Sequence, residues 1–260
     1  MKLRLLVLVA GICAAAAFAA AATADPFQRI CNGPETALFG PVTGNLTVTG
    51  NVYVPDGATL AVSGNLTIAP GACFDAYTQG TVTVGGNLKV GNGAVLGLGC
   101  SADAEGPTGP CMPAGNPGFR TNDVVGGNLV ANGPYTMYIT ASTIHGNLVS
   151  NGGGDPSLPP WLSYPIKATT VDGNLIVQGW QGAWMGVLRS TVGGNMIISR
   201  NVGTRPDENG NPDSTEIVSN QVSGNLICLN NTPTARIGDA PGGPNSVGGR
   251  AIGECAAISN

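Results

Sequence analysis

Apolar and polar residues alternate in short runs along most of the chain, and the runs recur with nearly the same letters. Leu46-Thr47-Val48 and Leu66-Thr67-Ile68 are two examples. An alternation of period two is typical of a β-strand with one buried face. No run after the N-terminal segment follows a helical period, so the pattern predicts many short strands and no helix in the body of the chain.

Most of these runs follow a pentapeptide of the form Val-x-Gly-Asn-Leu, which occurs eight times with small variations. Successive Asn residues of the pentapeptide are separated by 20, 22, 41, 19, 27, 21 and 30 residues. The four shortest steps define the repeat, and the longer ones indicate a repeat with an insertion or two repeats of which one is degenerate. Because Gly and Asn tolerate left-handed backbone angles, each Gly-Asn pair predicts a bend between two strands. The repeated asparagines are Asn45, Asn65, Asn87, Asn128, Asn147, Asn174, Asn195 and Asn225.

One repeat is too short to bury its own apolar side chains, but stacked repeats can bury them together. Stacking pairs each strand in parallel with its equivalent in the next repeat, at about 4.8 Å per step. The predicted fold class is therefore all-β, a right-handed parallel β-helix (β-solenoid) of about 8–9 coils that forms a single domain. The repeated Asn predicts an internal ladder of side-chain hydrogen bonds, and a simple turn-forming role is the alternative.

The repeats resemble those of the secreted bacterial Gly-Asn-Leu/Val repeat proteins, a group with a parallel β-helix fold and no characterised function. The resemblance runs from Val42 to the segment 248–255, and residues 222–233 with that Cys-containing tail are similar to the C-terminal end of the family. It implies an exported β-helix and carries over no catalytic residue.

The first 24 residues have the three parts of a secretory signal peptide. Lys2 and Arg4 precede an apolar stretch, which ends in the small-x-small sequence Ala22-Thr23-Ala24. We therefore expect residues 1–24 to be removed and the protein to be secreted, extracellular or held at the cell surface. No later stretch is apolar enough to cross a bilayer, so no membrane span is predicted in the mature chain.

The mature chain divides into a central β-helix and two terminal segments. Residues 25–41 are expected to form an N-terminal cap segment and residues 230–260 a C-terminal cap or tail. The β-helix then covers residues 42–229, with loop insertions near 101–122, 151–168 and 200–216.

Seven cysteines become six once Cys13 leaves with the signal peptide. An even number in an exported chain predicts disulfide bonds, although six cysteines allow 15 pairings. Proximity in sequence favours the first two of the following pairs, and the third is left by elimination. The pairs are Cys100–Cys111, Cys228–Cys255 and Cys31–Cys73.

The charge of the mature chain argues against one class of partner. Loss of Lys2 and Arg4 from 11 basic residues leaves 9, against 15 acidic residues, so the net charge is near −6. Nucleic-acid binding needs a concentrated basic face and is not expected. Cell-wall or extracellular polysaccharides and surface proteins stay open as partners.

The sequence shows no catalytic, cofactor-binding or metal-binding constellation. The single histidine, His145, fills the variable position of a repeat, where we expect it to point into solvent. The acidic segment 207–213 alternates oxygen-bearing side chains as calcium loops do. Pro212 and Val218, however, stand where such a loop needs Gly and Glu, which favours a plain solvated turn.

Polysaccharide-degrading β-helices are the enzymatic alternative, because such enzymes place carboxylates on neighbouring coils to flank the scissile bond. Asp123 and Asp172 are interpreted as sparse outward carboxylates on separate coils. Trp180 and Trp184 offer rings for stacking on a sugar, or they pack under a loop, and Trp161 is a third ring to compare with them. We expect an exported non-catalytic structural or surface-interaction protein, with an extracellular polysaccharide-binding or polysaccharide-cleaving protein as the alternative.

Overall fold

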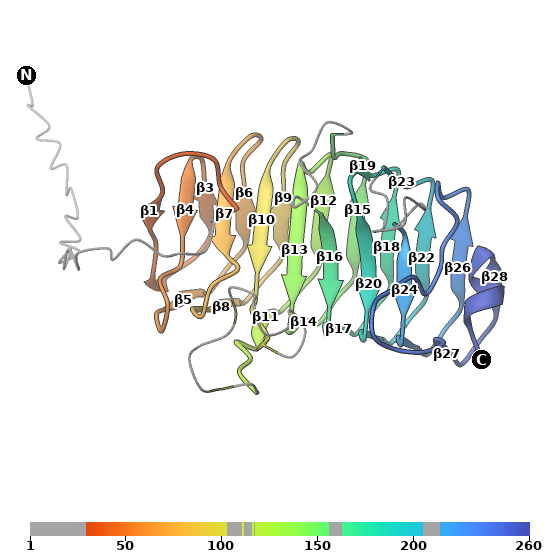
Figure 1. The fold of residues 1–260 in the computed structure, drawn as a ribbon. Coiled ribbons are helices and arrows are strands. Elements are labelled where there is room, and N and C mark those ends of the chain that lie inside the picture. Colours follow the sequence, from red (N-terminus) through yellow and green to blue (C-terminus); the bar gives the residue numbers. More distant parts are fainter. Residues whose placement is uncertain (1–29, 103–110, 112–115, 117, 156–162, 205–213) are drawn as a thin grey trace, which may run out of the picture.

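The computed structural model describes residues 30–102, 111, 116, 118–155, 163–204 and 214–260. The predicted signal peptide, residues 1–24, lies outside this part of the chain. Stacked parallel strands make up nearly half of the described residues, and they form three long sheets around one core (Figure 1). No helix among the described residues is long and apolar enough to cross a membrane.

Each coil contributes one strand to each of three sheets, which we call A, B and C in the order in which the chain visits them. Sheet A contains β1 (Thr36–Ala37), β4 (Asn51–Tyr53), β7 (Cys73–Ala76), β10 (Val95–Leu98), β13 (Thr136–Thr140), β16 (Tyr164–Lys167), β20 (Met185–Leu188) and β24 (Glu216–Val218). Sheet B contains β2 (Gly40–Val42), β5 (Thr59–Val62), β8 (Thr81–Val84), β11 (Asp123–Val125), β14 (Ser142–Ile144), β17 (Thr170–Val171), β21 (Thr191–Val192), β25 (Gln221–Val222) and β27 (Ser246–Val247).

Sheet C contains β3 (Leu46–Val48), β6 (Leu66–Ile68), β9 (Leu88–Val90), β12 (Leu129–Asn132), β15 (Leu148–Asn151), β18 (Leu175–Gln178), β22 (Met196–Ser199), β26 (Leu226–Leu229) and β28 (Ala251–Gly253). A small fourth sheet joins β19 (Gln181–Gly182) to β23 (Val202–Gly203), and a 3₁₀ helix, η1 (Glu254–Ile258), follows the last strand. The three long sheets have eight, nine and nine strands, which matches the predicted number of coils.

The winding of the chain is right-handed. In Figure 1 the strands of sheet A run down the front, those of sheet B cross the bottom, and those of sheet C return at the back. The chain meanwhile advances from left to right, which makes a right-handed turn. This is the usual sense of a crossover between parallel strands.

Equivalent residues of successive coils pair directly. Leu129 pairs with Leu148, which pairs with Leu175, and these side chains are fully buried. Inward residues of all three sheets thus form one continuous apolar cluster along the molecule. The repeat predicts this fold class correctly, because a fixed alternation in every coil leaves only one register that buries every leucine.

The sheets extend beyond both ends of the repeat region. β1 lies within residues 25–41 and β2 begins there, so the expected cap segment already contributes to sheets A and B. At the other end β27 and β28 extend sheets B and C before η1 begins. The sequence Val247-Gly-Gly-Arg250-Ala251 is a ninth, degenerate repeat in which Arg replaces Asn and Ala replaces Leu.

The repeated asparagines form a continuous hydrogen-bonded ladder where sheet B turns into sheet C. In each step the side-chain oxygen of one Asn accepts hydrogen bonds from the backbone N–H and the side-chain amide of the next. For Asn174 and Asn147 the two distances are 2.9 and 3.1 Å. The ladder runs without a break from Asn45 to Asn225, whose oxygen accepts the N–H of Arg250.

The glycine that precedes each ladder Asn is explained by a close approach between coils. Only Gly44 has a positive φ, of 85°. In the next seven copies the backbone has no such angle, but a Cβ added to Gly173 would lie 2.6 Å from Asn147 Oδ1. The expected role of these glycines as left-handed bend residues is therefore wrong at most positions. The glycine lets one coil come close enough to bond the Asn of the coil before it.

Two further polar ladders lie at the other corners, and the sequence analysis does not predict them. At the turn from sheet A to sheet B, Ser190 N–H donates to Asn220 Oδ1 at 2.9 Å. Asn220 in turn donates its N–H and side-chain amide to Asn245 Oδ1. At the turn from sheet C to sheet A, Asn201 and Asn231 repeat the arrangement. These ladders donate toward the C-terminus, whereas the first ladder donates toward the N-terminus.

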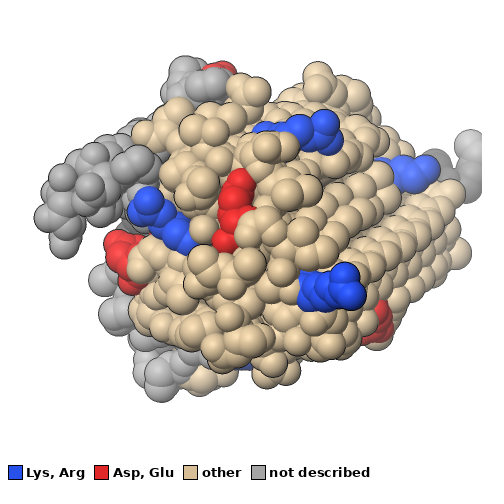
Figure 2. All heavy atoms as spheres, turned by 90° about the vertical axis from the view of Figure 1, so that its right-hand side faces the viewer, with Lys and Arg blue, Asp and Glu red and all other residues tan. Residues whose placement is uncertain are grey.

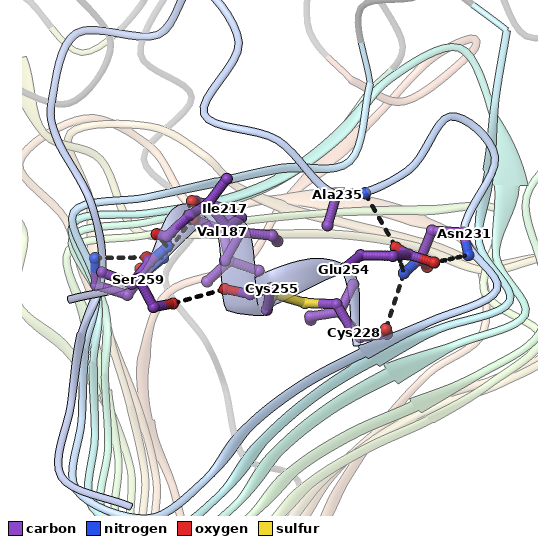
Figure 3. The surroundings of a disulfide bond; sticks show 12 residues. Val187, Ile217, Cys228, Asn231, Ala235, Glu254, Cys255 and Ser259 are labelled. Carbon is purple, nitrogen blue, oxygen red and sulfur yellow. Dashed lines mark hydrogen bonds between the residues drawn. A yellow bond between two sulfur atoms is a disulfide. The ribbon is translucent and has the colours of Figure 1, made fainter. Parts of the chain in front are cut away.

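The ladder at the C-to-A turn ends on a carboxylate that helps close the C-terminal end (Figure 3). Glu254 accepts hydrogen bonds from the N–H and the side-chain amide of Asn231 at 2.9 and 2.8 Å, and from Ala235 N–H at 3.0 Å. A carboxylate suits this end because it only accepts hydrogen bonds, and every group that faces it here is a donor. The adjacent Cys228–Cys255 disulfide joins β26 to η1.

Three disulfide bonds are present, and they are the three expected pairs. Cys31–Cys73 joins the first described residues to sheet A, and Cys100–Cys111 closes part of the first insertion. The cross-links therefore hold the N-terminal segment, one loop and the C-terminal end against the solenoid.

Candidate functional site

The outer face of sheet A is partly covered by other segments of the chain. Ile30 lies against Gly97 of β10, where an added Cβ would be 2.6 Å from Ile30 Cδ1. The rings of Tyr77 and Tyr138 pack beside it with their centroids 5.2 Å apart, next to the Cys100–Cys111 disulfide. This part of sheet A forms a small second core and is not an open binding surface.

Parts of all three predicted insertions, residues 103–110, 112–115, 117, 156–162 and 205–213, fall outside the described residues. The acidic segment 207–213 and Trp161 are among these residues, so the structure gives no account of the calcium interpretation or of that ring. Trp180 and Trp184 are described and differ. Trp180 is fully buried, and its ring centroid lies 5.3 Å from that of Tyr164, so it is a core residue. Trp184 is half-buried beside Gly186, on the outer side of sheet A.

Asp123 is fully buried, which contradicts its interpretation as an outward carboxylate. Its Oδ1 accepts the backbone N–H of Val82 at 2.9 Å, and Oδ2 is buried without a hydrogen-bond partner among the described residues. Burial raises the pKa of this carboxyl to about 7, against the lowering effect of its hydrogen bonds. Side chains alternate between the two faces of a strand, so Asp123, two residues before the inward Val125, also points inward. The polarity of aspartate suggested the opposite direction.

His145 and Asp172 occupy the same variable position in neighbouring coils, and both are exposed. His145 Nδ1 lies 2.8 Å from Asp172 Oδ2, and about half of each side chain is accessible to solvent. A carboxylate that orients a histidine through Nδ1 is a part of hydrolytic triads, but a triad also needs a nucleophile at the other ring nitrogen. The pair is therefore a solvated surface interaction, of the kind that contributes little to stability.

One acidic cluster has a spacing that could suit a metal, but its chemistry does not fit. Ligand atoms of Cys31, Glu35 and Asp75 all lie within 4.8 Å of one another. Cys31 is bonded to Cys73, so its sulfur is not available as a thiolate ligand. The cluster therefore carries no metal proposal.

The outer face of sheet C carries an unexpected column of aliphatic side chains. In the first three coils the outward position holds Thr47, Thr67 and Lys89. In the next six coils the same position holds only Val or Ile, and each pairs in register with the next. We call these six residues the aliphatic column: Val130, Val149, Ile176, Ile197, Ile227 and Ile252.

The aliphatic column reaches an exposed apolar end. Ile252 is 40% exposed and Leu229, in the adjacent strand, is 42% exposed. They are two of the three large hydrophobic side chains that are exposed in the described residues. The signal in the sequence is the change of the middle residue of each triplet from Thr or Lys to Val or Ile, but period two alone predicts a strand in either case.

The outer face of sheet B has a different composition in the same coils. Its outward column contains Thr143, Thr170 and Thr191, followed by Gln221 and Ser246. Both columns belong to strands of the same solenoid and both face outward, so β-branched polar residues fit this position as well as aliphatic ones do. The aliphatic residues of sheet C are therefore not demanded by the fold.

The charges that border sheet C are of both signs, because Lys89, Arg200 and Arg250 are basic whereas Asp172 and Glu254 are acidic. Lys89 is the one charged residue in the nine strands of this sheet. Arg250 is exposed two residues before Ile252, and Arg200 is exposed three residues after Ile197, where its guanidinium donates to Gln178 Oε1 at 3.3 Å. Figure 2 looks onto the C-terminal end, where basic side chains lie apart from one another and acidic side chains lie between them.

Some acidic side chains are buried, so the charge of the surface differs from the net charge of the sequence. Asp75, Asp123 and Glu216 are buried, whereas no described Lys or Arg is buried. The described surface is therefore less acidic than the net charge of the chain indicates.

Comparison with known proteins adds no functional information, because no family model, no curated protein and no solved structure matches the chain. The molecule is thus placed by its own geometry in the class of disulfide-bonded parallel β-solenoids. The resemblance to the Gly-Asn-Leu/Val repeat proteins stays a prediction.

Proposed function

We propose that this protein is an exported, non-catalytic structural or surface-interaction protein that acts through the outer faces of its solenoid. The observation that carries the proposal is the pair of regular outer faces on sheets B and C. They present equivalent side chains of successive coils in strict register, and on sheet C the aliphatic column runs beside Asn132, Asn151 and Gln178. Lys89 is the single charged outward residue in the strands of the two sheets. Such a surface offers extended contact with another surface and provides no acid and base that converge on one bond.

The internal structure supports a scaffold role. Three polar ladders satisfy the corner amides, and three disulfides attach the ends and one loop. A stiff support holds outward side chains at fixed spacing, which lowers the entropic cost of binding an extended partner. The predicted signal peptide and the disulfides both favour a location outside the cytoplasm.

The alternative function is binding or cleavage of an extracellular polysaccharide. Half-buried Trp184 is the described ring that favours it, since aromatic rings stack on sugars. Of the carboxylates considered for cleavage, Asp123 is buried and Asp172 is next to His145, so they do not flank a common site.

A polysaccharide panel separates these functions. The purified exported chain is incubated with soluble and insoluble polysaccharides, and both its retention and the release of reducing or unsaturated ends are measured. We expect no release above that of an H145A/D172N variant. Release that the wild-type chain catalyses would contradict the non-catalytic proposal, and retention without release would identify a polysaccharide as the surface that is bound.

A further inference from the structure

The aliphatic column combines apolar length with basic ends. It spans six coils, or about 24 Å at the spacing of paired strands. Lys89 continues the column at one end, and Arg250 stands beside its other end. Arg200 lies alongside, at the corner where sheet C turns into sheet A.

The acidic groups near this surface are few. Asp172 lies at the corner between sheets B and C with its Oδ2 2.8 Å from His145 Nδ1, and Glu254, directly after β28, accepts hydrogen bonds from Asn231 and Ala235. No acidic residue occurs in any strand of sheet C. Approach of a negatively charged surface is therefore favoured over approach of a second copy of this face. A second copy would bring Lys89 and the two arginines close to the basic residues of the other copy, which repel them.

We propose that the outer face of sheet C, through the aliphatic column with Lys89, Arg200 and Arg250, docks onto an anionic lipid surface. The aliphatic side chains then lie against the boundary between headgroups and acyl chains, and the basic side chains contact the phosphates. This inference rests on the proposed surface-interaction function and names its partner.

The chemistry of the column separates a lipid from a polysaccharide as the partner. Valine and isoleucine side chains offer a sugar neither a hydrogen bond nor an aromatic ring for stacking. They gain most from leaving water for an apolar medium, which a lipid surface supplies. The threonine column of sheet B has hydroxyl groups at the same spacing and would be the better sugar surface of the two.

Vesicle flotation tests the proposal with the full exported chain. Vesicles of phosphatidylcholine alone are compared with vesicles of equal parts phosphatidylcholine and phosphatidylglycerol, at low and at high salt. We expect binding to the phosphatidylglycerol vesicles that weakens with salt, because the basic residues act through screened charges. The I176T/I197T/I227T variant keeps β-branched side chains, and its affinity should fall at least about tenfold as apolar contact is lost.

Two matched variants complete the experiment. T143S/T170S/T191S changes the face of sheet B in three consecutive coils, which contain Val149, Ile176 and Ile197 of the column, and should bind as the wild type does. K89Q/R200Q/R250Q should lose both affinity and salt dependence.

Equal binding to neutral vesicles, or full binding by I176T/I197T/I227T, would overturn the proposal. A dimer in sedimentation that this triple variant abolishes would overturn it in favour of a second copy. None of these results contradicts the non-catalytic function, because only the release of polysaccharide fragments would contradict that proposal.

Discussion

At the scale of single residues, position within the coil decides the role of a side chain more than its chemical type does. Asn147 is a ladder residue although asparagine is common in turns, and Asp123 is a core residue although aspartate is usually exposed. In both cases the neighbouring coil, about 4.8 Å away, supplies the hydrogen-bond partner. A side chain in this fold therefore has to pack against, or form hydrogen bonds with, residues of the two adjacent coils.

The close approach at the ladder glycines gives a direct prediction. Replacing Gly173 by Ala puts a Cβ against Asn147 Oδ1, and the coils must separate or the Asn must turn away. We expect G173A to lower the free energy of unfolding by about 1–3 kcal/mol, as overpacking of a tight site does.

Gly50 provides the control, because an added Cβ there meets no atom within 4 Å. G50A should leave the free energy of unfolding unchanged or raise it by up to about 1 kcal/mol. Denaturant unfolding measures both variants, and equal stabilities would show that the spacing of the coils is not limited by glycine.

The buried carboxyl of Asp123 predicts a pH dependence of stability. Its pKa is about 7 in the folded chain against an ordinary value of 3.8, so the folded state binds the proton more tightly. Stability contributed by the neutral carboxyl is fully present below about pH 4 and is lost as the pH rises to about 7. The loss approaches about 4 kcal/mol, from roughly three pKa units.

An amide of the same shape isolates this group. D123N carries no charge at any pH, so the decline between pH 4 and 7 should be smaller in D123N by the contribution of Asp123. Denaturant unfolding of both proteins over that range gives the difference. Parallel stability curves would show that Asp123 does not bind the proton in the folded state.

At the scale of elements, the sequence predicts the strands and their order well because one pattern is repeated eight times. It does not predict the ladders at the other two corners, because their residues vary. The column Ser142, Thr169, Ser190, Asn220, Asn245 mixes three residue types, and the intervening insertions hide its period. Only the stacking of the coils shows that these residues share a position.

The surface of sheet C is another feature that the pattern could not assign. Alternation from the inward Leu175 places Ile176 outward, but Ile176 and Val177 are both aliphatic, so no change of polarity marks the outer face. A single outward aliphatic residue does not indicate a binding surface. It does so only when the equivalent residues of the adjacent coils are also known to be aliphatic. The candidate site of this protein is therefore a property of the stack and of no single repeat.

The carboxylate of Glu254 is predicted to hold the last coil in place. In E254Q an amide N–H₂ takes the place of one carboxylate oxygen and faces the donors of Asn231 and Ala235. We expect a loss of about 1–3 kcal/mol, the cost of leaving buried donors unsatisfied. Hydrogen exchange should rise first in residues 226–235 and in η1. The exposed Asp239 is the control, and D239N should not change exchange there.

At the scale of the whole molecule, the solenoid separates what makes the protein fold from what it offers to a partner. Leucines, ladder amides and disulfides lie inside or at the ends, and outward positions of sheets B and C vary without changing the coil. Ile30, Phe119 and the Cys100–Cys111 disulfide add a further layer on sheet A. The proposed partner surface is therefore the part of the molecule where the fold constrains the residue type least.

The most direct test of this account is the free energy of unfolding of I176T/I197T/I227T, measured by denaturant titration against the wild type. If the aliphatic column serves a partner, the three exchanges together should cost no more than about 2 kcal/mol, because each side chain is only half-buried and keeps its β-branch. A loss of more than about 5 kcal/mol, as expected for truncation of core residues, would contradict it. The column would then belong to the structural core, and its composition would say nothing about a partner.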